Sequence, residues 1–154
     1  MKRFFSILLL ISSLSAKDID LYATLGILSH HFDTDGYGNK YNENHNAYGI
    51  EAIYDQRYTL AYLHFTNSRN NTTDIAAIGY RYDIVDSFGI YGVVGYQHGY
   101  CFDKLKSIEC SEGKDNAGIA FIPMLYYRHK YFILDFMTQG DMVALKLNLK
   151  LYPY

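Results

Sequence analysis

The feature that most constrains the fold is a two-residue alternation of apolar and polar side chains near the end of the chain. Val143, Leu145, Leu147, Leu149 and Leu151 alternate there with Ala144, Lys146, Asn148, Lys150 and Tyr152. A period of two puts successive side chains on opposite faces of a β-strand, whereas one face of an α-helix repeats about every 3.6 residues. The segment is therefore predicted to be a strand with one apolar and one polar face.

Seven further segments are predicted to be strands. The first alternates in the same way from Ile19 to Ile27, and the others are 47–55, 58–66, 74–84, 88–99, 118–128 and 131–138. Most are close to the ~9–11 residues with which a tilted strand crosses a bilayer. The even strand number predicts an all-β fold, an eight-stranded antiparallel up-and-down transmembrane β-barrel.

Polar or small residues gather on one face of the middle strands. They are Gly49, Glu51 and Asp55, then Gly79, Arg81 and Asp83, and the opposite phase carries Tyr48, Ile50, Ala52 and Tyr54, then Ile78, Tyr80, Tyr82 and Ile84. A membrane barrel turns the apolar phase to lipid. A secreted soluble barrel of the lipocalin type has the same period with its apolar face inward, and it remains an alternative.

The predicted connections differ in length. Asp33–Asn46, Asn67–Thr73, Tyr100–Ala117 and Gln139–Asp141 alternate with tight turns at Asp55–Arg57, Asp83–Ser87 and Arg128–Lys130. Short periplasmic turns with longer external loops are typical of outer-membrane barrels. Tyrosines near the strand ends are candidates for interfacial girdles: Tyr22, Tyr48, Tyr58, Tyr82, Tyr100, Tyr131 and Tyr152.

The start of the chain is laid out as a signal peptide. Basic Lys2 and Arg3 precede the apolar run 4–11, and small residues follow up to Ala16. We expect a signal peptide at 1–16 and a single barrel domain at 17–154, located in the bacterial outer membrane. The formal net charge of −2 gives no reason to expect a nucleic-acid partner. A mean hydropathy of −0.13 suits a barrel with one polar and one apolar face.

The cysteines and histidines suggest no cofactor chemistry. Cys101 and Cys110 lie in one predicted external loop, where an oxidising compartment favours a disulfide between them. The six histidines lack the spacing of a metal site, and no nucleotide-binding motif occurs. We therefore expect neither a metal nor a cofactor.

Four residues with chemical potential fall at the predicted external rim. His30 and His31 end the first strand, and Asn67 and Ser68 follow the third. A neutral imidazole near a serine can take the hydroxyl proton as the serine attacks an ester. Strand phase predicts that His30 points into the lumen, and that His64 and Ser68 share a face with Tyr62 if the polar side of that strand is also inward. The alternative is that these are ordinary solvated residues.

Short motifs resemble the lipid A palmitoyltransferase (PagP) family. They are Ser29-His30-His31-Phe32, Lys40-Tyr41-Asn42-Glu43, Phe65-Thr66-Asn67-Ser68 and Ala77-Ile78-Gly79-Tyr80. The resemblance implies a barrel that moves a palmitoyl chain from a phospholipid to lipid A at the outer leaflet. Ser68 matches the family's serine and His30 or His31 its histidine, while Asn67 stands where the family has an aspartate. The implied partners are phospholipid, lipid A and the barrel-insertion machinery, for a monomeric protein.

Two other functions remain open. A non-enzymatic barrel of the OmpX or OmpA type would fill its lumen with a polar network such as Glu51, Arg81, Asp83, Lys146 and Lys150. A lipid A deacylase is suggested by His64-Phe65-Thr66-Asn67, although that family carries a similar motif near its C-terminus. An acyltransferase instead needs an apolar slot, for which strand phase offers Leu28, Ile53, Leu60, Ile75, Ala77 and Val93.

Overall fold

The computed structural model describes residues 18–34, 40–99, 117–139 and 141–151. These residues form eight strands: β1 (Ile19–His31), β2 (Tyr48–Tyr54), β3 (Tyr58–Thr66), β4 (Thr72–Val85), β5 (Phe88–His98), β6 (Ala117–Arg128), β7 (Phe132–Gln139) and β8 (Met142–Lys150). The predicted signal peptide and the Cys101–Cys110 disulfide lie outside the described residues. In the part of the chain that the structure describes, no helix is long and apolar enough to cross a membrane.

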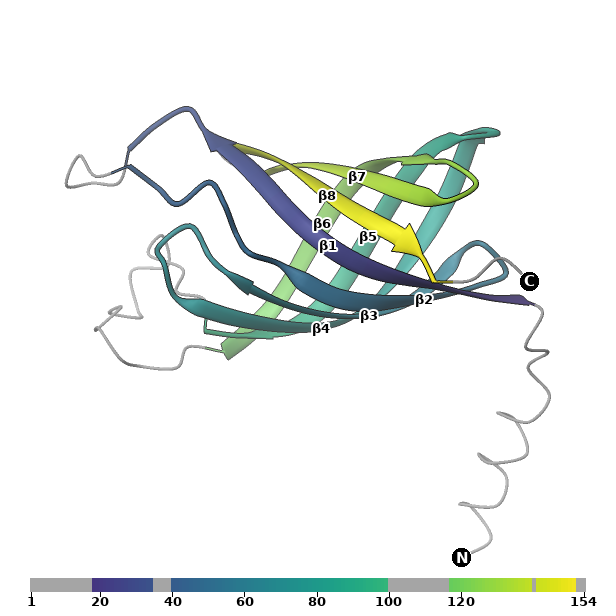
Figure 1. Cartoon of the computed structure of the whole chain (residues 1–154), viewed down its shortest axis with the longest axis horizontal. Helices are drawn as coiled ribbons and strands as arrows, with labels where there is room; N and C mark the ends of the chain where they lie inside the picture. The colour runs from purple at the N-terminus through teal and green to yellow at the C-terminus, as the bar shows by residue number, and fades with distance from the viewer. Residues whose placement is uncertain (1–17, 35–39, 100–116, 140, 152–154) are drawn as a thin grey trace, which may run out of the picture.

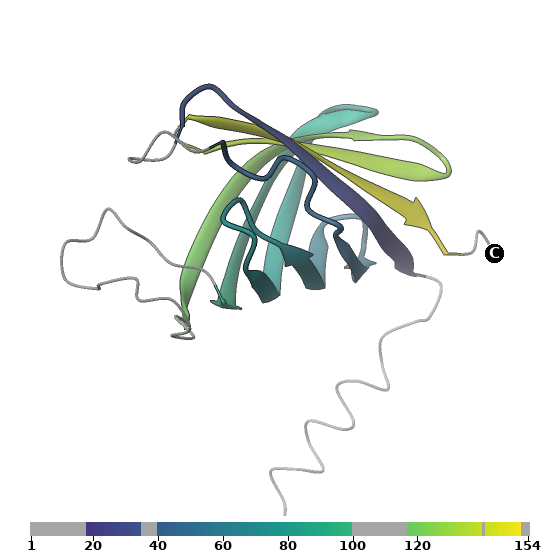
Figure 2. The same ribbon diagram turned by 60° about the vertical axis from the view of Figure 1, so that its left-hand side comes forward.

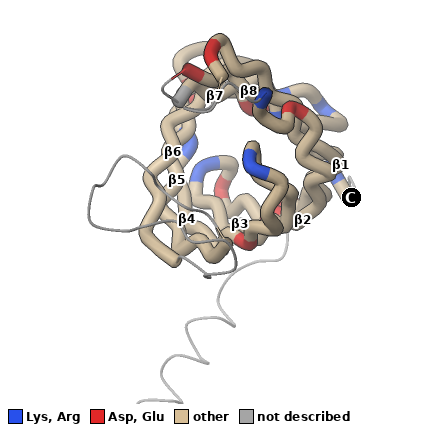
Figure 3. The backbone as a smooth tube through the Cα atoms, turned by 90° about the vertical axis from the view of Figure 1, so that its left-hand side faces the viewer, with Lys and Arg blue, Asp and Glu red and all other residues tan. Residues whose placement is uncertain are grey.

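The described strands close into a barrel. Each strand pairs antiparallel with the next, and β1 also pairs with β8. This confirms the predicted fold class. Strands β1, β3, β5 and β7 end at one end of the barrel, here named the loop end, and β1 begins and β8 ends at the other, the turn end (Figures 1 and 2). Figure 3 looks along the barrel from the loop end and shows the strands as a ring.

The β2–β3 connection illustrates the tight turns. Asp55 and Gln56 both have positive φ, 50° and 58°, and the Arg57 N–H donates to the Tyr54 carbonyl at 3.0 Å. Two successive left-handed residues match a type I′ turn, whose twist suits two antiparallel strands. The turn predicted at Asp55–Arg57 is thus confirmed.

The two faces of the strands carry different side chains. Glu51, Arg81 and Lys146 point into the barrel and are buried. The outer wall is instead a continuous apolar surface that includes Ile50, Ile78, Ile90, Val94, Phe121, Leu125 and Leu145. Tyr48, Tyr58, Tyr82 and Tyr131 are exposed on it as predicted, whereas Tyr22 is buried in the lumen.

A β-bulge in β1 reverses the face on which its later residues lie. Thr24 pairs with Asn148 but Gly26 pairs with Leu147, so Leu25 is an extra residue opposite β8. Tyr22 and Thr24 point inward before the bulge, and Ser29 points inward after it. Simple alternation therefore fails beyond Leu25.

The bulge corrects two predictions. His30 was expected in the lumen, but its side chain is 62% exposed on the outside, whereas that of His31 is only 9% exposed. Leu28, expected to line a lumen slot, is 61% exposed on the outer wall. Both errors have one cause, the single inserted residue, which shifts the phase of every side chain that follows.

The face of β3 also differs from the prediction. Thr59 is buried in the lumen, while Leu60 and Tyr62 are exposed on the outer wall. His64 lies on the Tyr62 side, where its Nδ1 contacts Asp74 at 2.8 Å. The polar side of β3 toward the loop end is thus the outer side, and Ser68, which is buried, does not share it. The polar groups of Tyr62, His64 and Asp74 satisfy one another there, which allows them to face outward.

Charged side chains fill the turn-end half of the lumen. The Arg81 guanidinium donates to Asp135 at 2.8 Å and to Glu51 at 3.0 Å. Lys146 pairs with both carboxylates, at 3.0 Å from Asp135. Asn148 donates to Asp135, and Thr24 donates to Asn148 at 2.7 Å. This polar network was predicted for Glu51, Arg81 and Lys146, whereas Asp83 pairs with Arg128 and Lys150 pairs with Asp20.

The ladder between β6 and β7 is shorter than the strands themselves. Within the described strands it runs from Arg128↔Ile133 to Met124↔Met137. The next residue of β6 toward the loop end is Pro123, which has no N–H to donate to a ladder. Toward the loop end β6 diverges from β7, as Figures 1 and 2 show.

Candidate functional site

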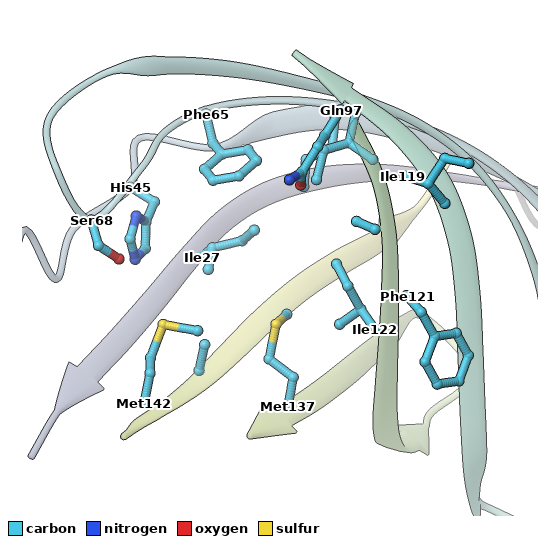
Figure 4. Close-up of a pocket in the computed structure, with 14 residues that line it drawn as sticks. Ile27, His45, Phe65, Ser68, Gln97, Ile119, Phe121, Ile122, Met137 and Met142 are labelled. Atoms are coloured by element: carbon cyan, nitrogen blue, oxygen red, sulfur yellow. The ribbon is translucent and has the colours of Figure 1, made fainter. Parts of the chain in front are cut away.

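An apolar cavity of about 290 Å³ occupies the loop-end half of the lumen. It is lined by Ile27, Leu63, Phe65, Ile75, Ile119, Ala120, Phe121, Ile122, Met137, Met142 and Ala144, with three polar residues, His45, Ser68 and Gln97 (Figure 4). The cavity size is near the lower end of the roughly 300–1,000 Å³ typical of small-molecule sites. Of the residues predicted to line a slot, Ile75 does so, Leu28 and Leu60 face outward, and Ile53, Ala77 and Val93 are buried in the lumen.

Ser68 and His31 form a hydrogen-bonded pair at the mouth of this cavity. The Ser68 Oγ lies 2.9 Å from His31 Nε2. Ser68 is buried and lines the cavity, and in Figure 4 it lies beside His45 at one end of it. The sequence offered His30 and His31 as alternative partners of Ser68, and the structure places His31 next to it.

The segment 40–44 holds this pair in place. The Tyr41 ring packs on the His31 ring with centroids 4.4 Å apart. The Asn42 N–H donates to the Ser68 carbonyl at 2.8 Å, and its side chain donates to the Asn67 carbonyl at 3.3 Å. Glu43 accepts a hydrogen bond from the His31 N–H at 3.2 Å. Three consecutive residues, Tyr41, Asn42 and Glu43, thus converge on Ser68 and His31.

Asn67 does not contact an imidazole. Its Oδ1 accepts from the backbone N–H groups of Arg69 and Asn71, at 2.8 and 3.1 Å. Its Nδ2 donates to Thr73 Oγ1 and to the Gly99 carbonyl, both at 3.0 Å. These bonds fix the β3–β4 connection and so the position of Ser68. Asn67 therefore acts in the structure as a clamp on the backbone, which differs from the catalytic role predicted for it.

The backbone conformation of Gly99 makes the hydrogen bond from Asn67 Nδ2 to the Gly99 carbonyl possible. Its φ is +86°, and a Cβ there would lie 2.0 Å from the Thr72 carbonyl oxygen. A glycine is the residue that accepts this conformation and this close approach at little cost. The end of β5 can then lie against the start of β4, where its carbonyl reaches Asn67.

His30 lies outside the site but contributes to its frame. Its Nδ1 contacts Glu43 Oε1 at 2.9 Å on the exposed rim. The backbone N–H of His31 and the His30 side chain hold the pKa of the Glu43 carboxyl below its usual range. His30 and His31 therefore have different surroundings although they are adjacent in the chain.

A second Ser–His pair lies close by and was missed in the sequence. His45 Nδ1 lies 2.7 Å from the Thr66 carbonyl, so it carries the proton and donates. His45 Nε2, 2.7 Å from Ser29 Oγ, is then the acceptor for the serine hydroxyl. Both residues are buried. Sixteen positions separate them, and no motif spacing marks such a pair.

The Ser68–His31 pair separates two different environments. The apolar cavity lies on the Ser68 side. On the His31 side is a second hollow of about 340 Å³, lined by His30, Phe32, Asp33, Thr34, Lys40, Tyr41 and Glu43 together with His31. A lipid ester has an apolar chain and a polar alcohol portion, and these two surroundings match its two parts. The arrangement is suited to placing an ester carbonyl at Ser68.

The described residues hold no group of three or more His, Cys, Asp or Glu side chains that could hold a metal ion.

Comparisons with known proteins give no family assignment. No family model matches the chain, and no curated protein matches it. One similar solved structure is that of Ail, the attachment invasion locus protein of Yersinia pestis, in complex with the heparin analogue sucrose octasulfate. It has a TM-score of 0.36 and 16% sequence identity, covering 86% of this chain and 93% of that chain. This similarity is too low to assign a function, so the function is inferred from the geometry of the chain itself.

Proposed function

We propose that this protein is a small β-barrel of the bacterial outer membrane whose loop-end half accepts the acyl chain of a membrane lipid. The location is supported by the outer wall. Large apolar side chains are exposed all around it, including Leu60, Ile78, Ile119 and Phe121. A water-soluble barrel would have to leave this surface in contact with water, at about 25 cal/mol per Å² of apolar area.

The apolar cavity supports the binding of an acyl chain in the loop-end half of the lumen. It lies inside the barrel, directly at a serine whose hydroxyl is hydrogen-bonded to an imidazole. Ile119 and Phe121 line it although both are largely exposed on the outer wall. The β6–β7 ladder stops below them at Met124↔Met137. A lipid chain can therefore reach the cavity from the side of the barrel as well as from the loop end.

The finer function that best uses this site is acyl transfer from a lipid ester. In the first step the Ser68 hydroxyl gives its proton to His31 Nε2 as its oxygen bonds to the ester carbonyl carbon. The bond from that carbon to the leaving alcohol then breaks, and the alcohol takes the proton from Nε2. An acceptor hydroxyl repeats these steps in reverse and receives the acyl chain. The motifs that resemble lipid A palmitoyltransferases supply the residues around this site, and lipid A is the acceptor we propose.

A second candidate is a non-enzymatic small barrel with a structural or adhesive role. The observation that favours it is the network of Arg81, Glu51, Asp135 and Lys146, which fills the turn-end half of the lumen with paired charges. Such a lumen needs no substrate. On this alternative the apolar cavity is a packing defect and the Ser–His pairs are structural hydrogen bonds.

Mass spectrometry of lipid A separates the two candidates. The full-length protein is expressed in a bacterium whose outer membrane lacks lipid A acylation of this kind, and its insertion is checked by heat-modifiable mobility on a gel. Acyl transfer predicts a new lipid A species one acyl chain heavier, which disappears with Ser68→Ala. Ser29→Ala is the matched control, since it removes the other buried serine hydroxyl that is bonded to a histidine. Unchanged lipid A in cells that hold the folded barrel would favour the non-enzymatic candidate.

A further inference from the structure

The Ser68–His31 pair lacks the acceptor that orients the histidine in a catalytic triad, a group hydrogen-bonded to the second ring nitrogen, Nδ1. His31 accepts the serine proton at Nε2 only if its own proton is on Nδ1. Among the described residues, Nδ1 is buried and has no hydrogen-bond partner. An unpaired buried donor destabilises the folded protein, and without an acceptor at Nδ1 the tautomer of the imidazole is not fixed.

One carboxylate faces this nitrogen. Asp141 Oδ2 lies 3.9 Å from His31 Nδ1, slightly beyond hydrogen-bond distance. Asp141 is in the β7–β8 connection, and its backbone carbonyl accepts a hydrogen bond from the Phe32 N–H at 2.9 Å. This backbone bond ties the connection to the end of β1, directly next to His31. The carboxylate is therefore held near the imidazole by the fold.

We propose that Asp141 is the positioning carboxylate of a Ser68–His31–Asp141 triad; this inference rests on the acyl-transfer function proposed above. Asp141 fixes the Nδ1–H tautomer of His31 and stabilises the imidazolium that forms when Ser68 gives up its proton. A rotation of the Asp141 side chain that moves its carboxylate oxygen by about 1 Å brings this oxygen within hydrogen-bond distance of His31 Nδ1. Opposite charges at this separation attract, so the imidazolium draws the carboxylate in, although water weakens the attraction because the Asp141 side chain is 46% exposed.

The neighbouring groups make Asp141 the best placed of the carboxylates. Glu43 is the other carboxylate near the ring, but it accepts from the His31 backbone N–H and pairs with His30. Asn67 is fully engaged with backbone groups and Thr73. The remaining groups that face His31 are Tyr41, which packs on the ring, and the imidazoles of His30 and His45, none of which is an acid. The acid partner therefore comes from β7–β8, about seventy positions after the serine in the chain.

The test uses the refolded barrel in detergent micelles and a fluorophosphonate, which labels serines that a histidine activates. We expect Asp141→Asn to lower the labelling rate of Ser68 at neutral pH by about tenfold to a hundredfold, less than the ~10⁴-fold loss known for a fully buried triad aspartate. Asp141→Glu should restore part of the rate. Asp86→Asn, the same change in an exposed turn at the other end of the barrel, is the matched control.

Long-range ¹H–¹⁵N spectra of the His31 ring give a second readout that does not need activity. We expect the Nδ1–H tautomer in the native protein and a titration midpoint that falls in Asp141→Asn. An unchanged midpoint together with an unchanged labelling rate would overturn the triad and leave acyl transfer standing. A lowered midpoint in a protein that neither labels nor alters lipid A would support the Asp141–His31 contact while contradicting the proposed function.

Discussion

The turn-end half of the lumen is filled by paired charges, whereas the loop-end half holds an apolar cavity bordered by two Ser–His pairs. In the first, Arg81 and Lys146 share the carboxylates of Glu51 and Asp135, and all four side chains are buried. In the second, Phe65, Ile75 and Met137 surround an open space. One half thus stabilises the closed barrel and the other can hold a molecule, which allows a small protein to combine rigidity with a binding site.

The largest effect should follow from breaking the charged half. Arg81→Met leaves Glu51 and Asp135 with Lys146 as their shared cation, and we expect a loss of about 3–5 kcal/mol in the free energy of unfolding. Urea unfolding of the barrel in phospholipid vesicles measures it. Lys150→Met is the control, because its partner Asp20 is partly exposed and the loss should be below ~1 kcal/mol. Equal losses in the two variants would show that the network has no special role.

The faces of β1 beyond the bulge can be exchanged by one inserted residue. An alanine inserted after Ile27 shifts the phase of every later residue, so His30 should point into the lumen and His31 outward. The insertion removes the Ser29–His45 and His31–Ser68 hydrogen bonds, which together contribute about 2 kcal/mol. Modification by diethylpyrocarbonate, located by mass spectrometry, should shift from His30 to His31. Deleting Leu25 is the control: it removes the extra residue while Gly26 keeps its pairing with Leu147, so His30 should stay the more reactive of the two.

The loop-end half should discriminate ligands by chain length. Each methylene of an alkyl chain that enters the cavity contributes about 0.8 kcal/mol, or about fourfold in affinity, until the cavity is full. Calorimetric titration with a series of acyl esters measures this slope. Ala120→Leu should end the increase at a shorter chain, because Ala120 lines the cavity. Ala76→Leu is the matched control on the exposed outer wall. A flat series would mean that no chain enters.

The smallest effect concerns pH at the rim. The pKa of Glu43 is lowered by the backbone N–H of His31, so the ionised form stabilises the end of β1. This contribution is complete above the pKa of Glu43 in the unfolded chain, and it is lost as the pH falls through the lower pKa of the folded protein. Hydrogen exchange of the His31 amide, corrected for its intrinsic pH dependence, should therefore lose protection in acid. Glu43→Gln should lack this dependence.

The sequence predicted the strands better than their faces. Alternation located all eight strands and placed Glu51, Arg81 and Lys146 in the lumen, because a charge in an otherwise apolar strand marks the inner face of a membrane barrel. The same reasoning failed in β1 and β3. A bulge leaves no clear mark in the sequence, and the polar pair of His64 and Asp74 made an outer face look like an inner one.

The site was predicted in part. Ser68 and His31 were among the residues singled out, and the structure joins them. His45, Ser29 and Asp141 were not, because each meets its partner through barrel closure and not through spacing in the chain. Asn67 was a catalytic candidate because it stands where the resembled family has an aspartate, and its bonds to the backbone of Arg69, Asn71 and Gly99 are visible only in the structure.

The sequence by itself determined that this chain forms a barrel of eight strands, since a period of two repeated along the chain admits few other folds. The tertiary structure decided which histidine faces the serine, where the apolar cavity lies and which carboxylate stands behind the ring. The physical reason is that one inserted residue reverses a strand's faces, while contacts between distant strands depend on register. Register is fixed only when β1 meets β8 and the barrel closes.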